Sequence, residues 1–157
     1  MTSTLIAGPG EEPVTLAEAK AFCRIDGSDE DALLSALIAA ARLQVESLTG
    51  RALVTQTWRL TVTCAPRLVE LPVIPAVSLV EAPDGAVLQG DAVLLVEPVD
   101  DLTVDYTVGY GDAADVPGDL KQAVLTLVAY WYENRDAVTM PPLGFDRLIA
   151  SYKRVRL

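Results

Sequence analysis

Two stretches near the start of the chain carry helical signals. Residues 15–18 read Thr-Leu-Ala-Glu, a capping box in which the Thr15 hydroxyl accepts a backbone hydrogen bond and Glu18 bonds back to the cap. A short helix to Phe22 or Cys23 is expected. A second helix follows the acidic turn 26–31, where Ser28 is the expected cap. Its apolar positions recur at helical spacing, and Gly50 is expected to end it: Leu34, Leu37, Ile38, Ala41, Val45 and Leu48.

After Gly50 the hydrophobic period changes from helical to alternating. Trp58, Leu60 and Val62 share one face of a predicted strand, with Thr and Arg on the other. Further strands are expected at 68–71, 77–81, 86–88, 92–97 and 102–108. Pro83-Asp84-Gly85 is typical of a tight hairpin turn. The middle of the chain is therefore predicted to be a small antiparallel β region.

The pattern becomes helical again after the glycine-containing turn 109–111. Pro117 begins an amphipathic helix that is expected to run to about Asn134, and Pro141-Pro142 prevents its continuation. A short apolar turn around Phe145 and Tyr152 then leads into a basic C-terminus. In the strand before this helix, one buried face and one acidic face are expected, since Asp105 alternates with apolar residues.

These elements predict an α+β fold. A helical pair at 13–51 and a long helix at 117–135 are expected to pack together, with the β region 55–108 inserted between them. The 157 residues suffice for one domain with a real core. Residues 1–12, small and rich in Gly and Pro, are expected to form a flexible arm, and residues 141–157 a C-terminal segment with a basic tail.

Charge is distributed very unevenly. The net charge is −10, and residues 68–120 contain eleven acidic side chains but no Lys or Arg. Such a block repels phosphates, which argues against general nucleic-acid binding. It is either a solvated surface or an acidic wall facing something that must slide past. The candidate residues for an acidic surface or channel are Asp84, Asp91, Glu97, Asp100, Asp101 and Asp105.

Residues for catalysis or metal binding are not apparent. The chain has no His, so a nucleophilic triad lacks its usual base, and adjacent strand residues such as Asp100 and Asp101 point to opposite faces. Cys23 and Cys64 lack metal-ligand spacing and are interpreted as buried free thiols. We therefore predict no enzyme activity, cofactor or metal. No secretory signal precedes residue 12, and the apolar stretch 123–132 is too short to span a membrane, so a cytoplasmic protein is expected.

Two groups near the C-terminus are candidate contact sites. Aromatic and polar residues close the last long helix, where they form either core or subunit contacts: Trp131, Tyr132, Asn134 and Arg135. The basic tail is either a frayed end or an arm that docks on an acidic partner surface. Its candidate docking residues are Arg147, Lys153, Arg154, Arg156 and Leu157.

Several motifs occur in a familiar order. They include Leu-Thr-Gly-Arg at 48–51, Gln-Thr-Trp at 56–58, Tyr-Thr-Val-Gly-Tyr-Gly at 106–111 and Trp-Tyr-Glu-Asn-Arg at 131–135, with the capping box before them. Together they resemble the head-tail connector, or adaptor, proteins of tailed bacteriophages, prophages and gene transfer agents. The resemblance covers residues 13–64 and 102–157, while the block between them matches only as generic β structure.

The resemblance implies a structural subunit that binds beneath the portal and joins capsid to tail in the particle neck. Its implied partners are the portal protein, copies of itself in a dodecameric ring packed through its helices, head-closure or tail proteins, and passing double-stranded DNA without sequence-specific contacts. Membranes are not among them. The alternatives are a small acidic binding module, such as an inhibitor or DNA mimic, and another neck protein such as a head-closure subunit.

Overall fold

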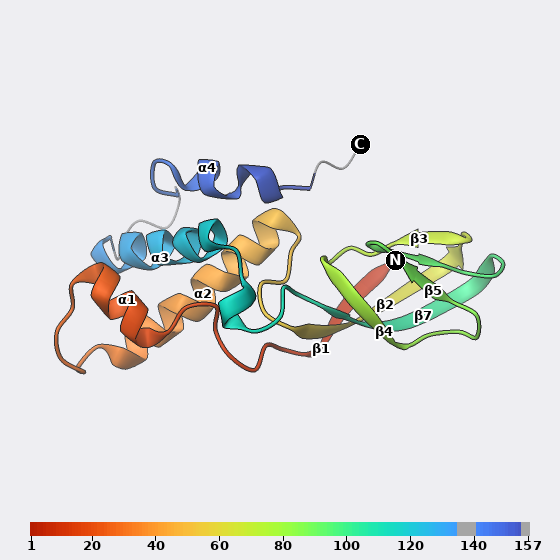
Figure 1. The fold of residues 1–157 in the computed structure, drawn as a ribbon, viewed down its shortest axis with the longest axis horizontal. Helices are drawn as coiled ribbons and strands as arrows, with labels where there is room; N and C mark the ends of the chain where they lie inside the picture. The colour runs from red at the N-terminus through yellow and green to blue at the C-terminus, as the bar shows by residue number, and fades with distance from the viewer. Residues whose placement is uncertain (135–140, 155–157) are drawn as a thin grey trace.

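The computed structural model describes residues 1–134 and 141–154 of the chain. Helices gather at one end of an elongated molecule and strands at the other (Figure 1). Each end has its own buried apolar cluster, so the protein has a helical part and a β part. Helices and antiparallel sheets in one chain confirm the α+β class.

The helical part begins with α1 (Leu16–Cys23), whose start confirms the predicted capping box. Thr15 Oγ1 accepts from the Glu18 amide at 3.1 Å, and Glu18 accepts from the Thr15 amide at 2.6 Å. The predicted Ser28 cap is wrong. Glu30 occupies the N-cap position of α2 (Asp31–Thr49), and Ser28 contributes its backbone carbonyl, which accepts from the Asp31 amide at 3.3 Å. A turn thus replaces the side-chain cap.

The second helix, α2, ends as predicted at Gly50, whose φ of 67° is the left-handed conformation that favours glycine. Leu34, Ile38, Ala41 and Val45 are buried in the helical core. Leu48 is 41% exposed, so its predicted place on the buried apolar face of α2 is wrong. The neighbouring Thr49 is buried at this point instead. Although α2 is long and apolar enough to cross a membrane, its buried stripe identifies it as a core helix.

The rest of the helical part comes from the end of the described chain. It consists of α3 (Gly118–Glu133), α4 (Phe145–Ile149) and two short 3-10 helices, η1 (Ala113–Asp115) and η2 (Ala150–Tyr152). The third helix, α3, lies between α2 and α4 and contacts both. The apolar face of α3, from Leu120 to Val128, is buried as expected for an amphipathic helix. Phe145 and Ile149 of α4 cover this face with fully buried side chains. Hydrophobic burial therefore holds the C-terminal segment to the helices.

The β part contains two antiparallel sheets. The larger sheet has the order β1-β2-β7-β4 and the smaller one the order β3-β6-β5. Their strands are β1 (Thr2–Ala7), β2 (Gln56–Ala65), β3 (Leu68–Glu70), β4 (Ala76–Glu81), β5 (Val87–Gln89), β6 (Ala92–Leu94) and β7 (Val99–Val108). The predicted alternation is confirmed in β2 and β7, where Leu60, Val62, Leu102 and Val104 face the β core.

Two sequence-based expectations about the β part are wrong. The N-terminal arm includes β1, which pairs with β2 from Thr2↔Thr61 to Ala7↔Thr57, because its β-favouring residues meet the open edge of a long strand. The turn at Pro83 forms, with the Ala86 amide donating to the Pro83 carbonyl at 3.0 Å. It is not a hairpin, since its flanking strands β4 and β5 belong to different sheets.

Candidate functional site

The helical and β parts meet at a junction made of three chain segments, 50–55, 72–75 and 108–111. Backbone hydrogen bonds join them: the Ala52 amide donates to Ile74 at 2.8 Å, and the Tyr110 amide donates to Leu53 at 3.2 Å. Gly109 has a φ of 118°, and a Cβ there would lie 2.6 Å from the Val54 carbonyl oxygen. Only glycine permits this close approach.

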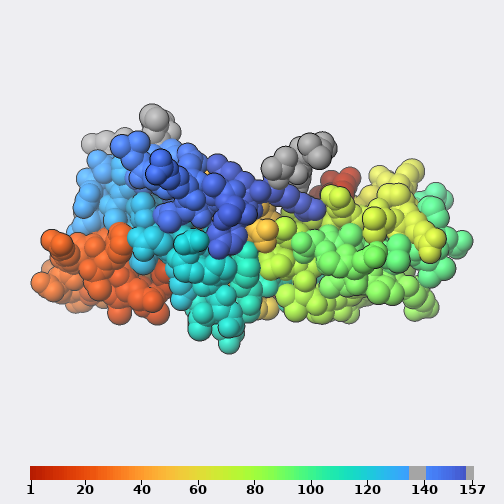
Figure 2. All heavy atoms as spheres, turned by 45° about the horizontal axis from the view of Figure 1, so that its top comes forward, coloured from red at the N-terminus to blue at the C-terminus, as the bar shows by residue number. Residues whose placement is uncertain are grey.

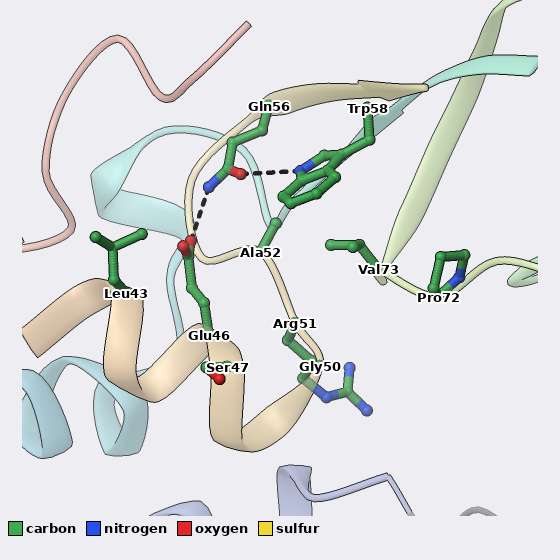
Figure 3. Close-up of a pocket in the computed structure, with 10 residues that line it drawn as sticks. All are labelled: Leu43, Glu46, Ser47, Gly50, Arg51, Ala52, Gln56, Trp58, Pro72 and Val73. Atoms are coloured by element: carbon green, nitrogen blue, oxygen red, sulfur yellow. Dashed lines mark hydrogen bonds between the residues drawn. The ribbon is translucent and has the colours of Figure 1, made fainter. Parts of the chain in front are cut away.

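The Glu46 carboxylate is the polar centre of the junction. It accepts a hydrogen bond from the Gln56 side chain at 2.7 Å (Figure 3). It also accepts from the Leu53 amide at 2.9 Å and from the Arg42 guanidinium at 2.8 Å. Burial raises the pKa of Glu46, and these partners oppose the shift. Arg42 also pairs with Glu12 at 2.8 Å. One helical carboxylate thereby fixes where β2 begins.

Arg51 ties the C-terminal segment to the same junction. Its Nε donates to the Tyr152 carbonyl at 3.0 Å, and its Nη1 donates to the Tyr110 hydroxyl at 3.2 Å. The guanidinium also lies 5.8 Å from the centre of the Tyr152 ring, within cation–π range. The Leu-Thr-Gly-Arg motif thus combines a helix terminator, Gly50, with a cation that binds two distant segments.

An open pocket of about 390 Å³ lies between α2 and the larger sheet (Figure 3). Leu43, Ala52, Trp58 and Val73 supply its apolar lining, and Glu46 lies at its polar side. The Trp58 indole is oriented by a 3.0 Å hydrogen bond to the Gln56 side chain. The position and the lining of the pocket make it an apolar feature of the junction.

The basic C-terminal segment lies partly against its own chain (Figure 2). Arg154 donates to the Leu71 carbonyl at 2.6 Å and pairs with Glu70 at 3.2 Å, while Lys153 pairs with Asp146 at 3.0 Å. Arg147 is exposed on α4. The other two docking candidates, Arg156 and Leu157, lie outside the described residues.

Four of the six acidic candidates are exposed. Asp84 lies in the turn after β4, Glu97 between β6 and β7, and Asp100 and Asp101 in β7. Asp91 is half-buried and accepts from the Ala76 amide at 2.9 Å, so it stabilises a turn. The acidic candidates therefore lie in several different turns and strands.

Asp105 does not belong to an open acidic face, and this expectation is corrected. Only 6% of the residue is exposed, because Arg59 of the neighbouring strand covers it with two hydrogen bonds of 2.7 Å. The Arg59 hydrogen bonds hold the pKa of Asp105 below its ordinary value, so both groups are ionised at neutral pH. The pair adds no net charge to its surface.

The outward side of β2 and β7 is rich in threonine. The cross-strand pairs on it are Thr57↔Thr107, Arg59↔Asp105, Thr61↔Thr103 and Thr63↔Asp101. We call these eight residues the threonine face. Hydroxyl groups and one neutralised ion pair dominate it, and Asp101 contributes its one unpaired charge.

The aromatic end of α3 serves the helical part. Trp131 packs half-buried against the core, and the Tyr132 hydroxyl donates to Glu30 at the start of α2. Asn134 follows the last turn, and its side chain donates to the Tyr130 carbonyl at 2.9 Å, as expected for a C-terminal cap. Arg135 lies outside the described residues.

Within the described residues, no group of three or more His, Cys, Asp or Glu side chains is placed to hold a metal ion. Cys23 and Cys64 are free thiols, but their expected burial is wrong, because Cys64 is exposed and Cys23 is only half-buried.

Comparisons with known proteins bear on this arrangement. Residues 13–89 match the family described as phage gp6-like head-tail connector proteins. Over this part of its length the chain is similar to head-tail connector proteins. The chain also resembles chains of three solved gene transfer agent (GTA) particle structures over 100% of its own length and 97% of theirs. No match was found among the curated proteins.

The three structures differ in what they contain. One is the virion of a native GTA particle, with a TM-score of 0.82 and 24% identity. Another is the neck of an empty GTA particle with C6 symmetry, with a TM-score of 0.84 and 24% identity. The third is the neck of a native GTA particle with C12 symmetry, with a TM-score of 0.81 and 26% identity. At such identities the likeness is chiefly one of fold. The connector family is structural and not enzymatic.

Sequence reasoning did not single out the residues that organise the junction. Glu46 had a signal in its spacing from Arg42, since residues four apart face each other on a helix. Arg51 was part of a recognised motif without an assigned role. The Arg59 pairing with Asp105 required the strand register, which the alternating pattern alone does not provide.

We predict that Glu46→Ala lowers the free energy of unfolding by about 3 kcal/mol, because the Leu53 amide and the Gln56 side chain lose their acceptor and Arg42 keeps only Glu12. Chemical denaturation followed by circular dichroism would measure the loss. Glu12→Ala is the matched control, and it should cost far less since Arg42 keeps Glu46. Equal effects of the two substitutions would contradict the central role of Glu46.

Proposed function

We propose that this protein is a structural adaptor subunit in the neck of a phage-like particle, where it joins the DNA-filled capsid to the tail. The observation that carries the proposal is the family match at residues 13–89 together with a likeness in fold, along the whole chain, to chains of GTA particles. The family match rests on sequence and the likeness to GTA chains rests on structure, and the two findings agree.

A ring of identical copies is the assembly that we propose. Necks with C12 and C6 symmetry among the similar structures favour a twelve-membered ring beneath the portal protein, with head-closure or tail proteins below it. A cyclic ring requires a heterologous contact, in which two different surfaces of the subunit meet around the circle. An elongated subunit with two distinct ends suits such an arrangement.

The threonine face supports a role beside passing DNA. DNA binds proteins mainly through phosphate contacts with Lys and Arg, so a surface that must let DNA slide should offer few free cations. On this face Arg59 is held by Asp105, and hydroxyls surround the pair. We propose that this face, together with exposed carboxylates such as Asp101, borders the conduit without retaining DNA.

Portal docking is proposed for the exposed part of the C-terminal segment. Lys153 and Arg154 already contact Asp146, Glu70 and Leu71 of the same chain, which leaves Arg147 as the exposed cation of α4. A charge at the rim of an interface mainly sets the rate of association and its salt dependence.

The decisive experiment is electron microscopy of particles from a producing culture that lacks this gene. We expect filled or leaking heads separated from finished tails, because the two would have no adaptor between them. Restoring the gene on a plasmid should restore joined particles. Normal tailed particles in the deletion culture would overturn the proposal and favour an acidic binding module.

We predict that Arg147→Glu reduces the yield of joined particles about tenfold, because it reverses a docking charge. Particle counts with the plasmid variant would measure this. Lys121→Glu, at a cation of α3 that interacts with Glu18 of α1, is the control. A normal yield with Arg147→Glu, or the same loss in the control, would exclude specific docking through Arg147.

We predict that Asp105→Asn makes the protein bind double-stranded DNA, because it frees Arg59 while keeping the shape of the side chain. Each added phosphate contact should steepen the log–log dependence of affinity on salt by about 0.9. Electrophoretic mobility shifts at several salt concentrations would measure it. Arg59→Gln in the same chain should abolish the gain, and Thr103→Asn on the same face should not produce it. Unchanged DNA binding by Asp105→Asn would contradict the neutralising role of the pair.

A further inference from the structure

The larger sheet has two open edges on opposite sides. The strand order β1-β2-β7-β4 leaves β1 and β4 with one neighbour each. Within the described chain, residues 2–7 and 77–81 make backbone hydrogen bonds only to those inner neighbours. An open strand edge presents a row of unpaired N–H and C=O groups and is a template for another strand.

The side chains of both edge strands do little to prevent pairing. β1 reads Thr-Ser-Thr-Leu-Ile-Ala and carries no charge, while β4 has one charge, at its last residue, Glu81. Apolar side chains on them are open to solvent: Leu5 is 45% exposed, Ile6 49%, Val77 58% and Val80 62%. Monomeric proteins usually blunt such edges with charges or cover them.

The two edges are complementary in length and direction. Each strand has six residues. Because all neighbours in this four-stranded sheet are antiparallel, β1 and β4 run in opposite directions. Copies related by rotation about a ring axis keep the direction of each strand along that axis. Joining β4 of one copy to β1 of the next therefore continues the antiparallel pattern.

Bulges limit the length of this contact. The register of β1 shifts between Leu5 and Ala7, and that of β4 shifts on either side of Ser78 and Leu79. A bulge bends its strand and ends regular pairing. Regular pairing is therefore confined to residues 2–5 of β1 and to Ser78 and Leu79 of β4, with Val77 and Val80 on either side. A short contact that repeats around a circle suits a closed ring.

We propose that β1 of each subunit pairs with β4 of the neighbouring copy, so that the sheets join around the ring. This inference rests on the proposed function, because it assumes a ring of this chain. It adds a contact through the β parts to the helix packing that the family resemblance implies. It also makes the threonine faces of successive copies a continuous surface.

Disulfide cross-linking within particles tests the pairing directly. With Cys23 and Cys64 first replaced by Ser, Ser3→Cys is combined in turn with Val77→Cys, Ser78→Cys, Leu79→Cys or Val80→Cys. Opposed residues of an antiparallel pair have Cβ atoms about 4.5–5.5 Å apart, close to the spacing in a disulfide. We expect at least one pair to give a ladder of covalent oligomers on non-reducing gels, whereas each single-cysteine chain stops at dimers.

A charge substitution provides a second, independent measurement. Val80→Lys should reduce incorporation of the chain into particles at least tenfold while leaving the melting temperature of the free protein unchanged. Val87→Lys is the matched control, since Val87 is 57% exposed on β5 of the other sheet. Equal incorporation of the two variants would overturn the proposed edge contact.

The outcomes separate this inference from the proposed function. If the cysteine variants enter the neck and none of the four pairs forms a ladder, the edge pairing is wrong and the adaptor role stands. Cross-links from these cysteines to a different neck protein would likewise overturn it and assign the edges to that partner. If the unmodified chain is missing from purified particles, the adaptor proposal itself fails.

Discussion

The structure depends on the junction of segments 50–55, 72–75 and 108–111, which joins a helical hydrophobic core to a separate β core. Glu46 stabilises this junction because it is buried at the end of α2 and bonds simultaneously to Arg42, the Leu53 amide and the Gln56 side chain. A buried carboxylate without those partners would be strongly destabilising. The direction in which β2 leaves the helical part is therefore coupled to the stability of α2.

Arg51 extends the same junction to the end of the chain. It bonds to Tyr110, which precedes α3, and to the Tyr152 carbonyl beyond α4, so three segments distant in sequence share one cation. Arg154 then attaches the last described residues to Leu71 in the β part. In the ring that we propose, the docking charges on α4 and the edge strands of the sheet contribute to one assembly only if their relative positions are fixed.

Local signals predicted much of the helical part. The capping box at Thr15, the terminating Gly50 and the stripe from Leu120 to Val128 all depend on residues within a few positions of one another, and all are present. The failures involve partners that are far apart in sequence. Residues 2–7 form a strand only because β2 offers an edge, and the turn at Pro83 connects two sheets instead of closing a hairpin.

The sequence by itself determined the α+β class, the span of its main elements, the excess of negative charge and the resemblance to a connector family. Those properties follow from periodicity, composition and short motifs. Tertiary structure alone decided that Arg59 neutralises Asp105, that Glu46 and Arg51 join the two parts, and that β1 and β4 are open edges among the strands of the described residues. Each of these depends on strand register or on contacts between distant segments, and a local pattern of residues does not specify either.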